Sequence, residues 1–185
     1  MCHDEPMGKQ LLWIAAFVSL GGIPSAWAQQ SDLLTMDELA GDWKISRQFT
    51  LEVAEKMPAE LYDFRPNAEQ MSFGGQMVHI AFAQAYRFHQ LTGSAPPFPL
   101  DEYPSRADKD TALKLLGQSF DYVIGVLPKI TAEQMAKTFK VDWKGRSEVN
   151  GRQMMMNMFV HTVHHRAQCE VYLRVKNITP PAYTF

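Results

Sequence analysis

Two histidines near the C-terminal end of the sequence, His161 and His165, lie four residues apart in a segment of helical character. Residues at positions i and i+4 of an α-helix project from the same face, one turn apart. Two imidazoles presented in this way form half of a common type of metal site. The same face is otherwise apolar, so the ring nitrogens need a partner, which a metal ion supplies. The spacing therefore predicts that both histidines bind a metal.

A third imidazole is expected from an earlier segment of the chain. His79 lies on the apolar face of a helix predicted from Ser72 to about Leu91. A lone inward histidine is more often a core residue with a hydrogen-bond partner, but the pair at 161 and 165 favours ligation. The alternative, a bundle in which the histidines are merely buried, predicts no bound metal after purification without an affinity tag.

Four polar residues are candidates for supporting this site. His164 lies on the flank of its helix, turned by about 60° and 100° from the two predicted ligands, and is expected to pack beside them or to hydrogen-bond one of them. Gln84, Asn157 and Gln168 can orient a water molecule or a ligand ring. No Asp or Glu lies on either histidine face, so the sequence offers no evident general base.

Three neutral imidazoles leave the double positive charge of a divalent ion undiminished and leave coordination positions open. Such an ion acts as a Lewis acid, and zinc can lower the pKa of bound water to about 7. Imidazole ligands favour zinc or nickel, and iron or manganese remain open alternatives. A metal site of this kind indicates a protein that carries out a reaction on a small-molecule substrate.

Amphipathic helices must position these residues. Thr35 and Glu38 form a predicted capping box at the start of the first helix, and Pro58 ends it. A connector from Thr92 to Ser105 contains four prolines and can cross the end of a helical bundle. The sequence therefore predicts an all-α fold whose apolar spacing defines four helices, at residues 33–57, 72–91, 108–127 and 151–176.

The pattern is weaker between Thr131 and Gly151. Thr131 to Gln134 can cap a short helical turn, and the alternation from Phe139 to Trp143 allows a short extended piece. The sequence leaves the structure of this segment open.

The first 28 residues have the regions of a secretory signal peptide. Lys9 precedes an apolar run from Leu11 to Leu20, and Ala28 ends a small-residue cleavage site. The run is short for a membrane span. We therefore expect an exported protein, periplasmic or secreted, with residues 29–185 as one domain. An uncleaved N-terminal anchor is the alternative to a cleaved signal peptide. Translation starts at either Met1 or Met7.

The composition is that of an ordinary globular protein, with 46% hydrophobic and 21% charged residues. The net charge of −2 provides no basic surface, so nucleic acid is not an expected partner. Removal of residues 1–28 takes Cys2 away and leaves Cys169 alone, which excludes an intramolecular disulfide in the mature chain. We expect no stable membrane insertion once the signal peptide is removed.

The order of the motifs resembles the DinB-like (damage-inducible, YfiT-like) superfamily over essentially all of residues 29–185. The matching motifs are His-Ile-Ala from His79, His-x-x-His-His-Arg-Ala-Gln from His161, Tyr-Leu-Arg from Tyr172, and a closing Pro-Pro pair. The combination is more specific than any one of these pieces.

The resemblance implies a four-helix bundle with up-down-down-up topology and a long crossover between helices 2 and 3. It implies a divalent metal bound by His79, His161 and His165, and a homodimer. It also implies a metal-dependent hydrolase or a thiol-dependent S-transferase that acts on a small molecule. A non-catalytic metal-binding stress-response bundle is the alternative.

Overall fold

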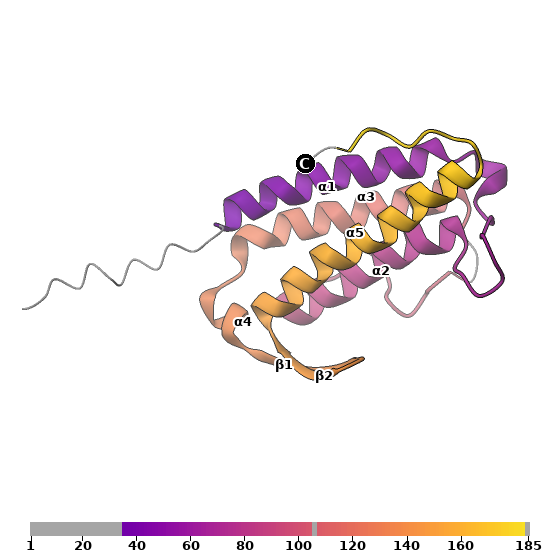
Figure 1. Cartoon of the computed structure of the whole chain (residues 1–185). Helices are drawn as coiled ribbons and strands as arrows, with labels where there is room; N and C mark the ends of the chain where they lie inside the picture. The colour runs from indigo at the N-terminus through magenta and orange to yellow at the C-terminus, as the bar shows by residue number, and fades with distance from the viewer. Residues whose placement is uncertain (1–34, 105–106, 184–185) are drawn as a thin grey trace, which may run out of the picture. The chain divides into compact units, whose positions relative to one another are not determined.

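A computed structural model of the chain describes residues 35–104 and 107–183 (Figure 1). The long elements of this part are four helices, α1 (Met36–Lys56), α2 (Phe73–Thr92), α3 (Lys109–Val126) and α5 (Gly151–Val175). Each end lies within three residues of the range predicted from the apolar spacing, so the all-α fold class is confirmed. The expected signal peptide, residues 1–28, lies outside the described residues. No helix in the described ranges has both the length and the hydropathy needed to cross a bilayer.

Each long helix begins at a side chain that caps its first turn. Thr35 Oγ1 accepts a hydrogen bond from the backbone of Glu38, and the Glu38 carboxylate accepts one from the backbone of Thr35, as the capping box predicts. Ser72, Asp108 and Asn150 accept equivalent backbone bonds at the starts of α2, α3 and α5. Such caps stabilise a helix by about 1 kcal/mol each. They set the residue at which each helix begins.

Ion pairs give the relative direction of α1 and α3. The Arg47 guanidinium of α1 lies 2.9 Å from the Asp121 carboxylate of α3. Lys109, at the start of α3, lies 3.5 Å from the carboxylate of Glu55, near the end of α1. Residue numbers rise along one helix as they fall along the other, so α1 and α3 are antiparallel.

Helix α2 lies between α3 and α5. Gln84 donates a hydrogen bond to Thr162 of α5 and accepts one from Ser119 of α3. Gln76, two turns earlier on α2, bonds Gln168, which lies beyond Thr162 on α5, so α2 and α5 are antiparallel. Helices α2 and α3 run in the same direction, and a long connector returns the chain between them (Figure 1). The up-down-down-up topology with its crossover is confirmed.

In the connector between α2 and α3, the described residues 93–104 pack against α2. The connector begins at Gly93, whose φ of +72° is a conformation that glycine adopts at low cost. The rings of Phe98 and Tyr103 lie 4.9 and 4.8 Å from the ring of Phe82, measured between centroids. Phe82 follows His79 by three residues, so the crossover covers part of the α2 face that carries this histidine.

A short helix and a hairpin form the segment that the sequence leaves open. Helix α4 (Ala132–Ala136) begins at a capping box between Thr131 and Gln134. Strands β1 (Thr138–Trp143) and β2 (Arg146–Asn150) pair antiparallel, and Gly145 occupies their turn with φ of +84°. The extended piece that the alternation allows is the first strand of this hairpin, which leads directly into α5.

Trp43 of α1 is fully buried and contacts an aromatic ring from each of the other long helices. Its ring centroid lies 5.5 Å from that of Phe88 on α2, 5.9 Å from Phe120 on α3 and 5.4 Å from Phe159 on α5. All three pairs meet edge to face, an arrangement worth about 0.5–1.5 kcal/mol each beyond the area buried. This cluster ties the four helices together.

Candidate metal centre

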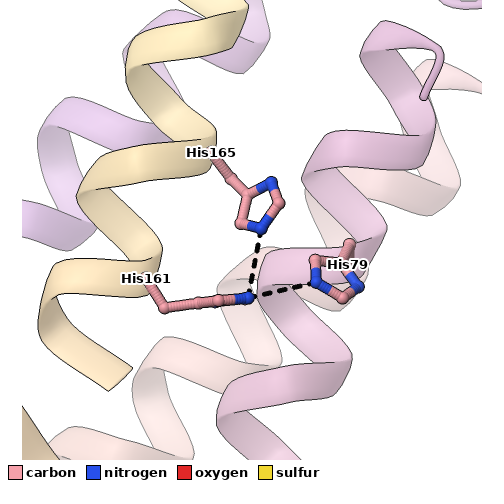
Figure 2. Close-up of side chains that lie close together, drawn as sticks. All are labelled: His79, His161 and His165. Carbon is pink, nitrogen blue, oxygen red and sulfur yellow. Dashed lines mark hydrogen bonds between the residues drawn. The ribbon is translucent and has the colours of Figure 1, made fainter. Parts of the chain in front are cut away.

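His79, His161 and His165 come together between α2 and α5 (Figure 2). Nε2 of His161 lies 3.1 Å from Nε2 of His79 and 3.1 Å from Nε2 of His165. One ring nitrogen from each histidine lies within 4.8 Å of the other two. The structure therefore brings together all three predicted ligands, in an arrangement that can hold a metal ion.

Hydrogen bonds among the three rings cannot satisfy all three nitrogens. The Nε2 atom of an imidazole carries either one hydrogen or one lone pair in the ring plane. Nε2 of His161 can therefore form a direct hydrogen bond with one neighbouring ring but not with both. A cation between the rings is contacted by all three lone pairs at once.

The separation of the nitrogens also suits a metal. Nitrogens bound at about 2.1 Å to a tetrahedral ion lie about 3.4 Å from one another. The two Nε2 separations of 3.1 Å are close to that value. The donor set fits a divalent ion better than it fits a cluster held only by hydrogen bonds.

Gln76 of α2 orients the ring of His165. Nδ1 of His165 donates to Oε1 of Gln76, which leaves the Nε2 lone pair directed toward the other two rings. The amide nitrogen of Gln76 donates in turn to Oε1 of Gln168 at 2.6 Å. Sequence reasoning did not assign this role to Gln76. Its position three residues before His79, on the same face of α2, is the signal that could have found it.

Of the predicted supporting residues, His164 and Gln168 form a polar pair next to the site. His164 is exposed, and its Nε2 lies 2.7 Å from the amide nitrogen of Gln168. Its ring centroid lies 5.0 Å from that of His165. Gln168 thus links the exposed His164 to the buried Gln76, which in turn bonds His165.

The other two predicted supporting residues lie in different surroundings. Asn157 is part of the wall of the cavity beside the histidines. Gln84 is fully buried, donates to Thr162 at 2.9 Å and accepts from Ser119 at 3.3 Å. Gln84 therefore joins α2, α5 and α3 through side-chain hydrogen bonds, and these bonds go to hydroxyl groups instead of imidazoles.

Burial lowers the pKa of all three histidines. The pKa of His161 falls to about 4, first because the ring loses solvent and then through repulsion from His79 and other cationic groups. The pKa of His165 falls to about 3 for the same first reason, followed by repulsion from His161 and His79. Desolvation also lowers the pKa of His79. The rings are neutral at pH 7 in the metal-free protein, as metal ligation requires.

A cavity of about 760 Å³ lies beside the histidines, and His79 and His161 form part of its wall. This volume is within the range of sites for small molecules. The aromatic side chains in its wall come from α2, the crossover and the hairpin, and are Phe82, Tyr86, Tyr103 and Trp143. None of the described residues that line it is Asp or Glu, in agreement with the lack of acidic residues on the histidine faces.

The chain is similar to an uncharacterized protein of Bacillus subtilis (strain 168), YjoA. The two are 25% identical over 134 residues, which covers 69% of this chain and 82% of YjoA. The crystal structure of YjoA, a DinB-like protein, matches with a TM-score of 0.60 at 22% identity, over 78% of this chain and 95% of YjoA.

Two further crystal structures show the same fold. A DinB-like protein from Bacillus cereus ATCC 10987 matches with a TM-score of 0.65 at 17% identity, over 80% of this chain and 97% of its own. A conserved protein from Enterococcus faecalis matches with a TM-score of 0.61 at 16% identity, over 77% of this chain and 96% of its own.

The family model of the DinB superfamily matches residues 42–169, a span that includes Gln76 and all three clustered histidines. This span is more than half of the chain. The chain belongs to the DinB superfamily.

Proposed function

We propose that this protein is a divalent-metal-dependent enzyme, a hydrolase or a group transferase such as an S-transferase, that acts on a small molecule. His79, His161 and His165 are the proposed ligands. The observation that carries the proposal is the convergence of their Nε2 atoms beside a cavity of about 760 Å³. Structural metal sites are closed by protein ligands, whereas two of these histidines line a cavity, which supports a reactive role.

Zinc or nickel is the metal that three imidazoles favour. When bound, such an ion supplies Lewis acidity and lowers the pKa of water. The protein contributes the fixed tautomer of His165, which Gln76 holds through Nδ1. It also contributes a cavity wall that includes four aromatic side chains, next to which electrostatic interactions are stronger than in water.

Elemental analysis of the mature protein, purified without an affinity tag, tests the metal site. We expect about one equivalent of zinc or nickel per chain, and a large loss in His79→Ala and in His161→Ala. His89→Ala is the matched control, because His89 also lies on α2 but its Nδ1 contacts the carbonyl of Ser94. A chain without metal, or unchanged metal content in His79→Ala, would overturn the proposal.

A substrate screen tests the reaction class. Metal-loaded protein is assayed with esters, amides, phosphate esters and thiol-transfer substrates. We expect turnover with at least one class, and its loss in His161→Ala while the helical circular dichroism spectrum persists. Turnover that survives this substitution would exclude the metal from the reaction.

A non-catalytic metal-binding stress-response protein is the second candidate. It is favoured by the absence of Asp and Glu from the described residues that line the cavity, because carboxylates commonly act as general bases. Stoichiometric metal without turnover across the whole screen would support this candidate. Activity with any substrate class would count against it.

We also propose that residues 1–28 direct export and are removed. The basic, apolar and small-residue regions ending at Ala28 support this. N-terminal sequencing of protein recovered from the periplasm or the medium is expected to begin at Gln29. Recovery of the intact chain in the membrane fraction would instead support an uncleaved anchor.

A further inference from the structure

The cavity beside the histidines has a cationic side. Three of its lining residues carry a positive charge: Arg87 of α2, and Lys144 and Arg146 at the turn of the β1–β2 hairpin. In the described part of the chain, no acidic residue lines the cavity to balance them. A concave surface lined by charges of one sign attracts ligands of the opposite sign.

Arg87 is held in place between α2 and the hairpin. Its Cζ atom lies 5.0 Å from the ring centre of Tyr86 and 5.1 Å from that of Trp143. Contact with aromatic faces orients a guanidinium without consuming its N–H groups. Arg87 is therefore positioned before any ligand arrives.

Most hydrogen-bond donors of Arg87 are available to a ligand. Nη1 donates to Oε1 of Gln90 at 2.8 Å. Among the described residues, no carboxylate forms an ion pair with Arg87. A guanidinium has five N–H donors in a planar fork that matches the oxygens of carboxylates and phosphates. An anionic group of that shape can accept hydrogen bonds from the N–H groups of Arg87 that no described residue uses.

The same cavity also offers apolar surface to the body of a ligand. Arg87 follows His79 by eight residues of α2, about 12 Å along the axis at 1.5 Å per residue, and both residues line the cavity. Phe82 and Tyr103 line the cavity and contact each other, with ring centroids 4.8 Å apart. A ligand that fills the cavity can therefore contact Arg87, these rings and the histidines.

We propose that the cavity binds a small organic anion, with a carboxylate or phosphate group held by Arg87 and an apolar or aromatic body against Phe82 and Tyr103. That this anion is the substrate rests on the proposed function. Binding of the anion does not rest on that function, because Arg87 can hold an anionic group whether or not a metal is bound. The two statements can therefore be tested separately.

Fluorine NMR titrations test the inference with three ligands: 4-fluorobenzoate, 4-fluorophenyl phosphate and neutral 4-fluorobenzamide. Each is titrated with the purified protein in a chelator-treated and a zinc-loaded form. We expect at least one anion to bind about tenfold more tightly than the amide in both forms, because hydrogen bonds to charged groups contribute about 1.5–3 kcal/mol. The preferred anion identifies the head group as carboxylate or phosphate.

Variants assign the selectivity to Arg87. Arg87→Met is expected to lose about tenfold in anion affinity with little change for the amide. Arg87→Lys keeps the charge without the fork and is expected to retain part of the selectivity. Arg152→Met is the matched control, since it removes the same charge from an exposed residue in the first turn of α5, outside the cavity lining. Circular dichroism confirms that each variant is folded.

The outcomes separate the two proposals. Equal affinity for anions and amide, or anion affinity unchanged in Arg87→Met, would overturn the inference even if zinc binds. Anion binding that depends on Arg87 in a protein that fails to bind zinc would leave the inference intact and overturn the proposed metal site.

Discussion

Oε1 of Gln76 on α2 accepts a hydrogen bond from Nδ1 of His165 on α5. Histidines that bind metals usually donate their second ring nitrogen to such an acceptor, which fixes the tautomer and the ring orientation. Gln76 is itself held by its bond to Gln168 and is 1% exposed. The orientation of His165 is therefore set by a residue of α2, the helix that carries another proposed ligand, His79.

Replacement of Gln76 is expected to weaken metal binding. Gln76→Leu leaves Nδ1 of His165 without its acceptor, and loss of such a partner typically costs 10–100-fold in metal affinity, so we expect a loss of about that size. Gln76→Glu retains an acceptor and is expected to preserve affinity. Competition with a chromophoric zinc chelator at pH 7 measures both variants.

The control for this experiment is Gln84→Leu. Gln84 is equally buried on α2 but bonds Thr162 and Ser119. We expect it to lower the free energy of unfolding without changing the zinc affinity of the folded protein. Equal losses of affinity in the leucine variants of both glutamines would show that packing, and not the bond to His165, is responsible.

The stability of the metal-free protein is expected to fall as the pH is lowered from 7 to 4. Unfolded histidines have a pKa near 6.5, whereas burial lowers the pKa of His161 to about 4 and that of His165 to about 3. Below pH 6.5 the unfolded chain therefore binds more protons than the folded chain, and protonation favours unfolding. This stability is fully present above pH 6.5, declines as the pH falls below 6.5, and stops declining once the pH is below the folded values.

Urea unfolding in the presence of a chelator, at pH 7, 6 and 5, measures this effect. The slope cannot exceed about 1.4 kcal/mol per pH unit for each histidine. A variant with His161→Gln and His165→Gln is expected to show a shallower pH dependence than the parent protein. Identical pH profiles for the two proteins would show that His161 and His165 do not cause the pH dependence of stability.

Trp43→Ala is expected to cost about 3–5 kcal/mol of unfolding free energy, as is typical when a large buried aromatic side chain is removed. The reason is its simultaneous contact with Phe88, Phe120 and Phe159. Chemical denaturation followed by circular dichroism measures the loss. Trp143→Ala, on the half-buried face of the hairpin, is the comparison and is expected to cost less. A cost for Trp43→Ala no larger than that for Trp143→Ala would show that the cluster does not hold the helices together.

The thiol of Cys169 is expected to be unreactive in the folded protein. The residue is fully buried, and desolvation raises its pKa well above the ordinary value, so little thiolate forms at pH 8. Titration with a chromogenic disulfide reagent in a Cys2→Ser background is expected to detect no thiol without denaturant and one thiol in guanidinium. Rapid native reaction would show that α5 opens locally near this position.

The four long helices could be predicted from the sequence because their signals are local. Apolar residues recur at helical spacing, and caps such as Thr35 mark where helices begin. The histidine cluster could be predicted for a related reason. Two ligands share one helix face by their spacing alone, and His79 lies on the inward face of its own helix, which packs directly against α5.

Other features depend on contacts between distant segments. Gln76 acquires its role from His165, which follows it by 89 residues. From the sequence alone, nothing distinguishes Arg87 from an ordinary surface arginine. Its role depends on contact with Trp143, which the hairpin supplies. The hairpin itself is short and only partly alternating, so its pairing is set by tertiary packing. Such relationships appear only when the chain is folded.

All three clustered imidazoles project from α2 and α5, and no residue of α1 or α3 lines the adjoining cavity within the described ranges. Helices α1 and α3 therefore support the site without contributing a described residue to the histidine cluster or to the cavity lining. This division offers protein engineers a choice of target. Thermostabilising libraries can be confined to the outward faces of α1 and α3, while libraries that seek new reactions can be confined to the α2 and hairpin residues around the cavity.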